Sequence, residues 1–133
     1  MSIDDYVAQF ASIVDACSIV ARYRLQVDRK TKEIAFISGR IDFRDGSILD
    51  VKEFIEKTGK GTEKYKYAYN YRQDSETIFR YDNAPDPRAK GLPSFPYHKH
   101  LRSGELVASL QITLSEVLVE IERMQVIPSC ILT

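Results

Sequence analysis

The chain contains two histidines, His98 and His100, which lie two residues apart in a segment rich in polar side chains. Histidine is the side chain best suited to proton transfer near neutral pH, and lysine or arginine can stabilise charge that develops on a phosphate. Cleavage of RNA without a metal needs such a set, because the 2′-hydroxyl must lose a proton while the leaving oxygen gains one. The candidate catalytic residues are His98, His100, Arg80, Lys99 and Tyr81.

The same segment permits two other interpretations. His98, His100 and Asp82 could hold a divalent ion through imidazole and carboxylate ligands. However, two histidines at this spacing often arise by chance, and no third histidine or cysteine is placed to help. Alternatively, the polar residues only fix a proline-rich loop, with Asp82 and Asn83 organising its start. We expect a site without metal or other cofactor.

A second candidate site is a basic surface on a predicted sheet. If the strands pair as hairpins, basic side chains at alternating positions share one face, with only two acids, Asp42 and Asp82, at matching positions. The candidate nucleic-acid-binding residues are Arg22, Arg24, Arg40, Lys64, Lys66 and Arg72, and Arg44 and Arg80 would join them. Such a face suits a phosphate backbone. The alternative is a solvated sheet face, and a slip of one residue in register would separate the set.

Four tyrosines alternate along one predicted strand, at Tyr65, Tyr67, Tyr69 and Tyr71. They could form a platform on which nucleic-acid bases stack. Half-buried aromatic residues of strands more often pack against helices, and that is the interpretation we favour.

Hydrophobic periodicity predicts the elements that position these residues. Apolar residues at helical spacing predict a helix over 4–16. A period of two then predicts strands over 18–28, 33–44, 47–54, 63–72 and 77–81, although the third also fits a short turn of helix. Four prolines predict an irregular loop over 83–101. The last segment is either one amphipathic helix over 105–125, or a strand-like 106–112 followed by a helix from Thr113.

Length and composition favour one ordinary globular domain over 1–133, of class α+β. We expect an N-terminal helix, a twisted antiparallel sheet of about five strands, and a C-terminal helix packed on one face of it.

The 19 basic and 19 acidic residues balance, so net charge says nothing about a nucleic-acid partner. The acidic opening MSIDDYVAQF is unlike a signal peptide, and no apolar run is long enough to span a bilayer. With Cys17 and Cys130 as free thiols, we expect a cytoplasmic protein.

Two motifs together resemble the TumE family of proposed toxins. They are Arg80-Tyr81-Asp82-Asn83-Ala84-Pro85 and, after a short spacer, Phe95-Pro96-Tyr97-His98-Lys99-His100. The segments 45–47, 64–72 and 114–121 are also similar to that family, so the resemblance covers roughly residues 18–122. The chain departs from the family pattern at Asp86 and Tyr97, where the family tends to have histidine. This departure indicates a weakened or diverged member.

The resemblance implies the toxin of a prokaryotic toxin–antitoxin pair, with a helix-turn-helix antitoxin as its protein partner. By analogy with other small toxins, we expect a metal-independent ribonuclease that binds RNA on its basic sheet face. The alternative is a non-catalytic module that binds nucleic acid or protein. That module would be a homodimer if apolar residues near the C-terminus cover a second copy, and these residues are Val126, Ile127, Ile131 and Leu132.

Overall fold

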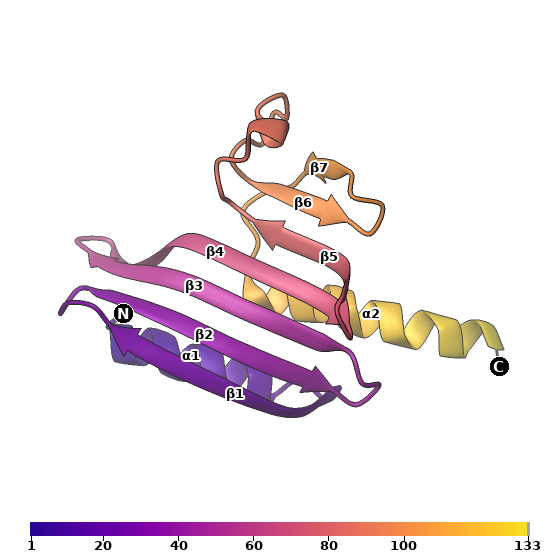
Figure 1. Ribbon diagram of the computed structural model, residues 1–133. Coiled ribbons are helices and arrows are strands. Elements are labelled where there is room, and N and C mark those ends of the chain that lie inside the picture. The colour runs from indigo at the N-terminus through magenta and orange to yellow at the C-terminus, as the bar shows by residue number, and fades with distance from the viewer. Residues whose placement is uncertain (133) are drawn as a thin grey trace.

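The computed structural model describes the backbone of residues 1–132 and the side chains of residues 1–125. Along the chain, one helix precedes seven strands and a second helix follows them, with a short 3-10 helix between the fifth and sixth strands (Figure 1). The elements in order are α1 (Ile3–Asp15), β1 (Val20–Arg29), β2 (Ile34–Phe43), β3 (Ile48–Thr58), β4 (Gly61–Gln73), β5 (Glu76–Asp82), η1 (Pro87–Ala89), β6 (His98–Leu101), β7 (Leu106–Ala108) and α2 (Leu114–Leu132).

Helix α1 begins where the sequence provides a cap. The Ser2 side chain accepts a hydrogen bond from the backbone N–H of Asp5, and the Asp5 carboxylate accepts one from the backbone N–H of Ser2. This reciprocal capping box satisfies backbone donors that the first turn would otherwise leave unpaired. The helix then buries Ile3, Phe10 and Val14 along one side.

The strands form one antiparallel sheet in which each strand pairs with the next along the chain. Tight turns join the first five strands, and at one of them Gly46 adopts φ +91°, which suits glycine. The register places Ala68 opposite Asp82 and Asp82 opposite His98. Side chains two residues apart point to the same face, so this register decides which residues meet across the sheet.

Both helices pack on the same face of the sheet (Figure 1). Apolar side chains of β2, β3 and β4 are buried there with those of α1 and α2, among them Ile37, Leu49, Val117 and Ile121. None of the described helices packs on the opposite face, and we call it the open face. None of the described helices is long and apolar enough to cross a membrane.

The class α+β and the single C-terminal helix are confirmed, but the sheet has seven strands instead of about five. The two additional strands are β6 and β7, within and after the predicted loop. The second interpretation of the C-terminal segment is the right one, because β7 ends at Ala108 and the helix begins at Leu114. Thr113 and Glu116 form the expected hydrogen bonds at its start. The predicted third strand, over 47–54, corresponds to β3 and contains no turn of helix.

Candidate functional site

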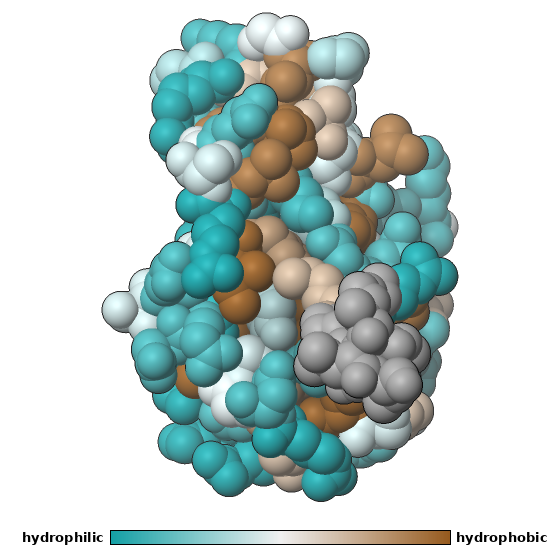
Figure 2. Space-filling model, turned by 90° about the vertical axis from the view of Figure 1, so that its right-hand side faces the viewer, coloured by the Kyte–Doolittle hydropathy of each residue, from teal (hydrophilic) through white to brown (hydrophobic). Residues whose placement is uncertain are grey.

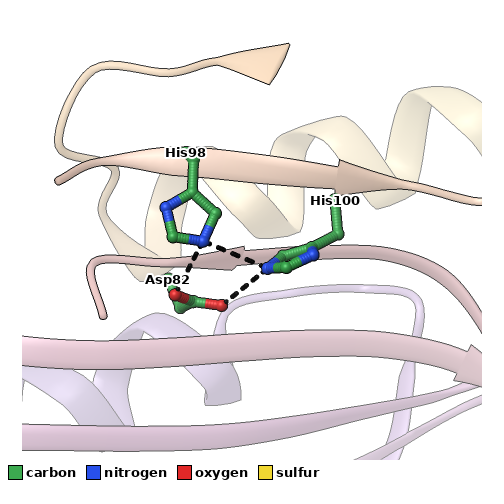
Figure 3. A group of neighbouring side chains, drawn as sticks. All are labelled: Asp82, His98 and His100. Atoms are coloured by element: carbon green, nitrogen blue, oxygen red, sulfur yellow. Dashed lines mark hydrogen bonds and ion pairs between the residues drawn. The ribbon is translucent and has the colours of Figure 1, made fainter. Parts of the chain in front are cut away.

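The two histidines meet on the open face beside one carboxylate. His98 and His100 project from β6 toward Asp82 on β5 (Figure 3). The Nε2 atom of His98 lies 3.0 Å from Oδ1 of Asp82 and 3.1 Å from Nε2 of His100. The Nε2 atom of His100 lies 3.1 Å from Oδ2 of Asp82. In Figure 3 helix α2 lies behind the sheet, so the cluster occupies the face away from the helices.

Neighbouring groups hold Asp82 and His98 in place. The Arg80 guanidinium donates a hydrogen bond of 3.0 Å from Nε to Oδ2 of Asp82, and the backbone N–H of Ala84 donates one of 3.0 Å to Oδ1. The Nδ1 atom of His98 lies 2.8 Å from the carbonyl oxygen of Pro96. Because a carbonyl can only accept, Nδ1 of His98 carries the proton.

Exposure divides the cluster into buried and accessible members. The His98 side chain is 0% exposed and that of Asp82 is 6% exposed, whereas His100 retains 20% and Arg80 retains 45%. Burial lowers the pKa of His100 below its usual value, although the nearby Asp82 carboxylate opposes this shift. A partner approaching the open face would therefore meet Arg80 and His100 first.

The structure does not bring Tyr81 and Lys99 to this cluster. Each alternates with the residues of the cluster along its strand, so both side chains point to the helix-covered face. There Glu120 of α2 accepts a hydrogen bond of 2.5 Å from the Tyr81 hydroxyl and forms an ion pair of 2.7 Å with Lys99. The predicted catalytic set thus separates into two groups on opposite faces of the sheet.

The Asn83 side chain bonds to the backbone of β4. Its side-chain oxygen accepts a hydrogen bond from the backbone N–H of Tyr67, and its side-chain amide donates one to the carbonyl of Tyr65. Asn83 therefore extends the pairing of β4 beyond the end of β5. Asp82, which was predicted to organise the loop together with Asn83, is the acceptor at the centre of the cluster.

Most of the predicted basic residues share the open face with the cluster. By register, Arg24, Arg40, Arg80 and His100 form one row across the strands, together with Asp50 and Asn70. Arg22, Lys66 and Arg72 also lie on this face. Figure 2 shows the molecule from the side, where hydrophilic residues alternate with hydrophobic patches and the outline is hollowed between the upper and lower parts.

Lys64 lies on the helix side, contrary to the predicted grouping. A register shift between Phe54 and Ile55 places Lys64 opposite buried Ile55 and Lys66 opposite Phe54. Lys64 donates to the Tyr69 hydroxyl at 2.8 Å and to the carbonyl of Ile112. The shift also separates the tyrosines, because Tyr67, Tyr69 and Tyr71 are buried whereas Tyr65 is 46% exposed.

Acidic partners neutralise part of the open face. Asp42 pairs with Arg22 and Arg40, Asp82 pairs with Arg80, and Asp50 pairs with Arg72 at 2.6 Å. Asp50 was not among the acids expected on this face. Among the described residues, no ion pair involves the basic side chains of Arg24, Lys52 or Lys66.

Sequence reasoning missed a group of aromatic residues beside these cations. Phe36 stacks on Phe54 with ring centroids 4.4 Å apart, and Tyr65 lies 6.0 Å from Phe54. The Lys66 ammonium lies 5.3 Å from the centroid of the Phe54 ring. The alternating patterns of β2 and β3 place Phe36 and Phe54 on the same face of the sheet. Only the register of the two strands shows that the rings lie side by side.

A second polar centre lies under the helices. Glu53 is 1% exposed and accepts hydrogen bonds of 2.5 Å from the hydroxyls of Tyr6 and Tyr69. It lines a pocket of about 650 Å³ with Lys64 and the first turn of α2. Burial and the Glu53 charge raise the pKa of both tyrosines. This centre ties α1 to the sheet and lies on the face opposite to the histidine cluster.

Comparisons with known proteins agree with the resemblance seen in the motifs. No curated protein and no solved structure matches the chain. A family model described as toxin TumE matches residues 10–125, which includes every residue of the histidine cluster. The chain therefore belongs to the TumE toxin family.

Proposed function

We propose that this chain is the toxin of a toxin–antitoxin pair and that it binds and cleaves RNA on its open face. Membership of the TumE toxin family supports the role of toxin and implies a cognate antitoxin. We propose an antitoxin of the helix-turn-helix type. RNA as the target is supported by the charge and aromatic pattern of the open face.

The open face offers a path for a single strand of RNA. The row that contains Arg24, Arg40, Arg80 and His100 crosses six strands. Neighbouring strands lie about 4.8 Å apart, so this row extends over about 24 Å. Cations along such a path can neutralise several phosphates, and the aromatic group at Phe54 and Tyr65 can stack on bases.

The observation that carries the proposal is the convergence of His98, His100, Asp82 and Arg80 on this basic face. His100, the accessible imidazole, takes the proton of the 2′-hydroxyl as the 2′-oxygen bonds to phosphorus. The bond from phosphorus to the 5′-oxygen breaks, and this oxygen takes a proton from water. Arg80 stabilises charge on the phosphate. His98 is buried and can exchange protons only through its neighbours in the cluster.

The proposal is tested with purified protein and total bacterial RNA. We expect wild type to release fragments that end in a 2′,3′-cyclic phosphate or its hydrolysis product. His100→Ala and Arg80→Ala should each slow this cleavage at least about 100-fold. Arg102→Ala is the matched control, because Arg102 is exposed and pairs with Glu76 away from the cluster. Intact RNA with wild type, or equal cleavage by His100→Ala, would exclude this site.

A second candidate is a binding module without catalysis, which the burial of His98 favours. A fully buried histidine bonded to a backbone carbonyl is typical of a structural role. In this case alanine at His100 preserves RNA binding and toxicity, whereas charge reversal at Arg40 or Lys66 abolishes both. A homodimer remains a prediction, because the side chains of Val126, Ile127, Ile131 and Leu132 lie outside the described residues.

A further inference from the structure

The arrangement of protons in the histidine cluster is incomplete. Three contacts of 3.0–3.1 Å join Nε2 of His98, Nε2 of His100 and the two oxygens of Asp82. Each Nε2 atom carries either one proton or one lone pair, and never both. Each Nε2 atom takes part in two of the three contacts, so its one proton or lone pair would need to serve two partners. No protonation state of the three side chains makes all three contacts linear hydrogen bonds.

A cation between the three side chains removes this conflict. It needs only lone pairs, and the hydrogen bond from Nδ1 of His98 to the Pro96 carbonyl leaves a lone pair on Nε2. A metal-binding histidine almost always donates its other N–H to such an acceptor, which fixes the tautomer and the orientation of the ring. Asp82 is also held by outer partners, through Arg80 and the backbone N–H of Ala84.

The distances also fit an ion. Nitrogen and oxygen ligands lie about 2.0–2.2 Å from a divalent transition metal. Two neighbouring ligands of an octahedral ion are then about 3.0 Å apart, and two ligands of a tetrahedral ion about 3.4 Å apart. We infer that Asp82, His98 and His100 form a binding site for a single divalent transition-metal ion, such as Zn²⁺ or Co²⁺. Two imidazoles select against Mg²⁺ and Ca²⁺, which prefer oxygen ligands.

The ion would occupy the cluster to which we assign RNA cleavage, but the inference of a metal site does not depend on that activity. Three protein ligands leave at least one coordination position for water or for a phosphate oxygen. Arg80 and His100 are the accessible members of the cluster, so a phosphate that approaches the ion would meet the Arg80 guanidinium. The ion uses the Nε2 lone pairs, so proton acceptance by His100 and metal binding exclude each other at the same moment. A metal-loaded protein that cleaves RNA would do so by a route other than the metal-free one.

The test is metal binding by the full chain, freed of metal by a chelator and carrying no polyhistidine tag. We expect one Zn²⁺ or Co²⁺ per chain by calorimetry, and at least tenfold weaker binding of Mg²⁺. Asp82→Asn and His100→Ala should each weaken Zn²⁺ binding at least about tenfold. Asp50→Asn is the matched control, because Asp50 also pairs with an arginine on this face, and its affinity should equal that of wild type.

A measurement on wild type alone keeps the inference open to refutation if a variant fails to fold. The chain has two histidines, so their ring nitrogens give separate NMR signals. Saturation with Zn²⁺ should shift the Nε2 signals of both His98 and His100. Absence of saturable binding, unchanged Nε2 signals, or equal affinity in Asp82→Asn and wild type would overturn the site. None of these results depends on whether the protein cleaves RNA.

Discussion

His98 and His100 lie two residues apart on one strand, yet their side chains meet different surroundings. His98 is fully buried and bonded to the Pro96 carbonyl, whereas His100 faces the open side beside Arg80. The spacing in the sequence predicts that both point the same way, and it also places Asp82 within reach once the strands pair. The spacing cannot show which histidine is buried, because it does not reveal contacts such as that of His98 with the Pro96 carbonyl, in the loop that precedes β6.

Burial predicts that the two histidines differ in their effect on stability. His98→Ala should lower the free energy of unfolding by about 2–4 kcal/mol, because it leaves a cavity and removes a partner of buried Asp82. His100→Ala should cost about 1 kcal/mol, since its side chain is partly solvated. Urea unfolding followed by circular dichroism measures both. Equal losses would contradict the difference in burial.

The Glu53 centre predicts that stability falls at alkaline pH. The pKa values of Tyr6 and Tyr69 are raised by burial first and by the Glu53 charge second. A group whose pKa is raised by folding stabilises the protein below its unfolded pKa, and this contribution is lost as pH rises above that value. We therefore expect the free energy of unfolding to decline above about pH 10. The lowered pKa of Lys64 acts in the opposite direction below that pH.

Paired substitutions measure the contribution of these tyrosines. Tyr69→Phe removes one titrating hydroxyl, so the decline between pH 9 and pH 11 should be shallower than in wild type. Tyr65→Phe is the control, because Tyr65 is exposed on the other face. The same slope in Tyr69→Phe and wild type would show that the Glu53 centre does not govern alkaline unfolding.

At the scale of elements, alternation within strands predicts most of the sheet. The helix α1 and the strands β1 to β5 all lie where periodicity places them. Strand β6 was missed because it is short and its residues, such as His98 and Lys99, are polar, whereas β7 lies within the strand-like segment 106–112 of the second interpretation. Pairing with β5, on the other side of the intervening loop, makes β6 a strand. The register shift at Phe54 has no signal in the sequence, and for that reason Lys64 and Tyr65 were assigned to the wrong faces.

The close pairing of β1 with β2 depends on Gly39. A Cβ atom at this position would lie 2.6 Å from Cδ2 of Leu25 and 3.1 Å from the carbonyl oxygen of Arg24. Gly39→Ala should therefore destabilise the protein by about 1–3 kcal/mol in thermal or urea unfolding. A Cβ at Gly91 would have no neighbour within 4 Å, so Gly91→Ala serves as the control. A stability unchanged by Gly39→Ala would mean that the strands can move apart at no cost.

The ion pair between Lys99 and Glu120 connects β6 to α2. Its side chains are 20% and 29% exposed, and Lys99→Ala should cost about 1 kcal/mol of stability. Toxicity on expression should persist, because Lys99 faces away from the histidine cluster. Lys90→Ala, in the exposed loop, is the control. Loss of toxicity in a folded Lys99→Ala protein would return this residue to the catalytic set.

At the scale of the whole molecule, a chain of zero net charge carries more basic than acidic side chains on the strands of its open face. Arg24, Lys52 and Lys66 pair with no acid among the described side chains and leave positive charge on the open face, where Lys66 lies over the Phe54 ring. Composition alone could not indicate this, because the totals balance. The candidate basic face was nevertheless largely predictable, because alternation places arginines at matching positions of consecutive strands.

Binding of RNA by this face should depend strongly on salt. Each phosphate contact with single-stranded RNA contributes about 0.7 to the slope of log K against log salt. Lys66→Glu should weaken binding of a 2′-O-methyl RNA, which resists cleavage, and reduce that slope by about one contact. Fluorescence anisotropy at several salt concentrations measures this. Lys32→Glu, in the turn between β1 and β2, should change neither quantity.

The most direct test of the central claim is induced expression in a heterologous bacterium without the antitoxin. Growth and the integrity of total RNA are followed together for wild type, His100→Ala, Arg80→Ala and the Arg102→Ala control. We predict growth arrest with loss of RNA for wild type and Arg102→Ala, and neither effect for the other two. Growth arrest by all four proteins with intact RNA would contradict an RNA-cleaving site at the histidine cluster. It would indicate that the protein is toxic through binding alone.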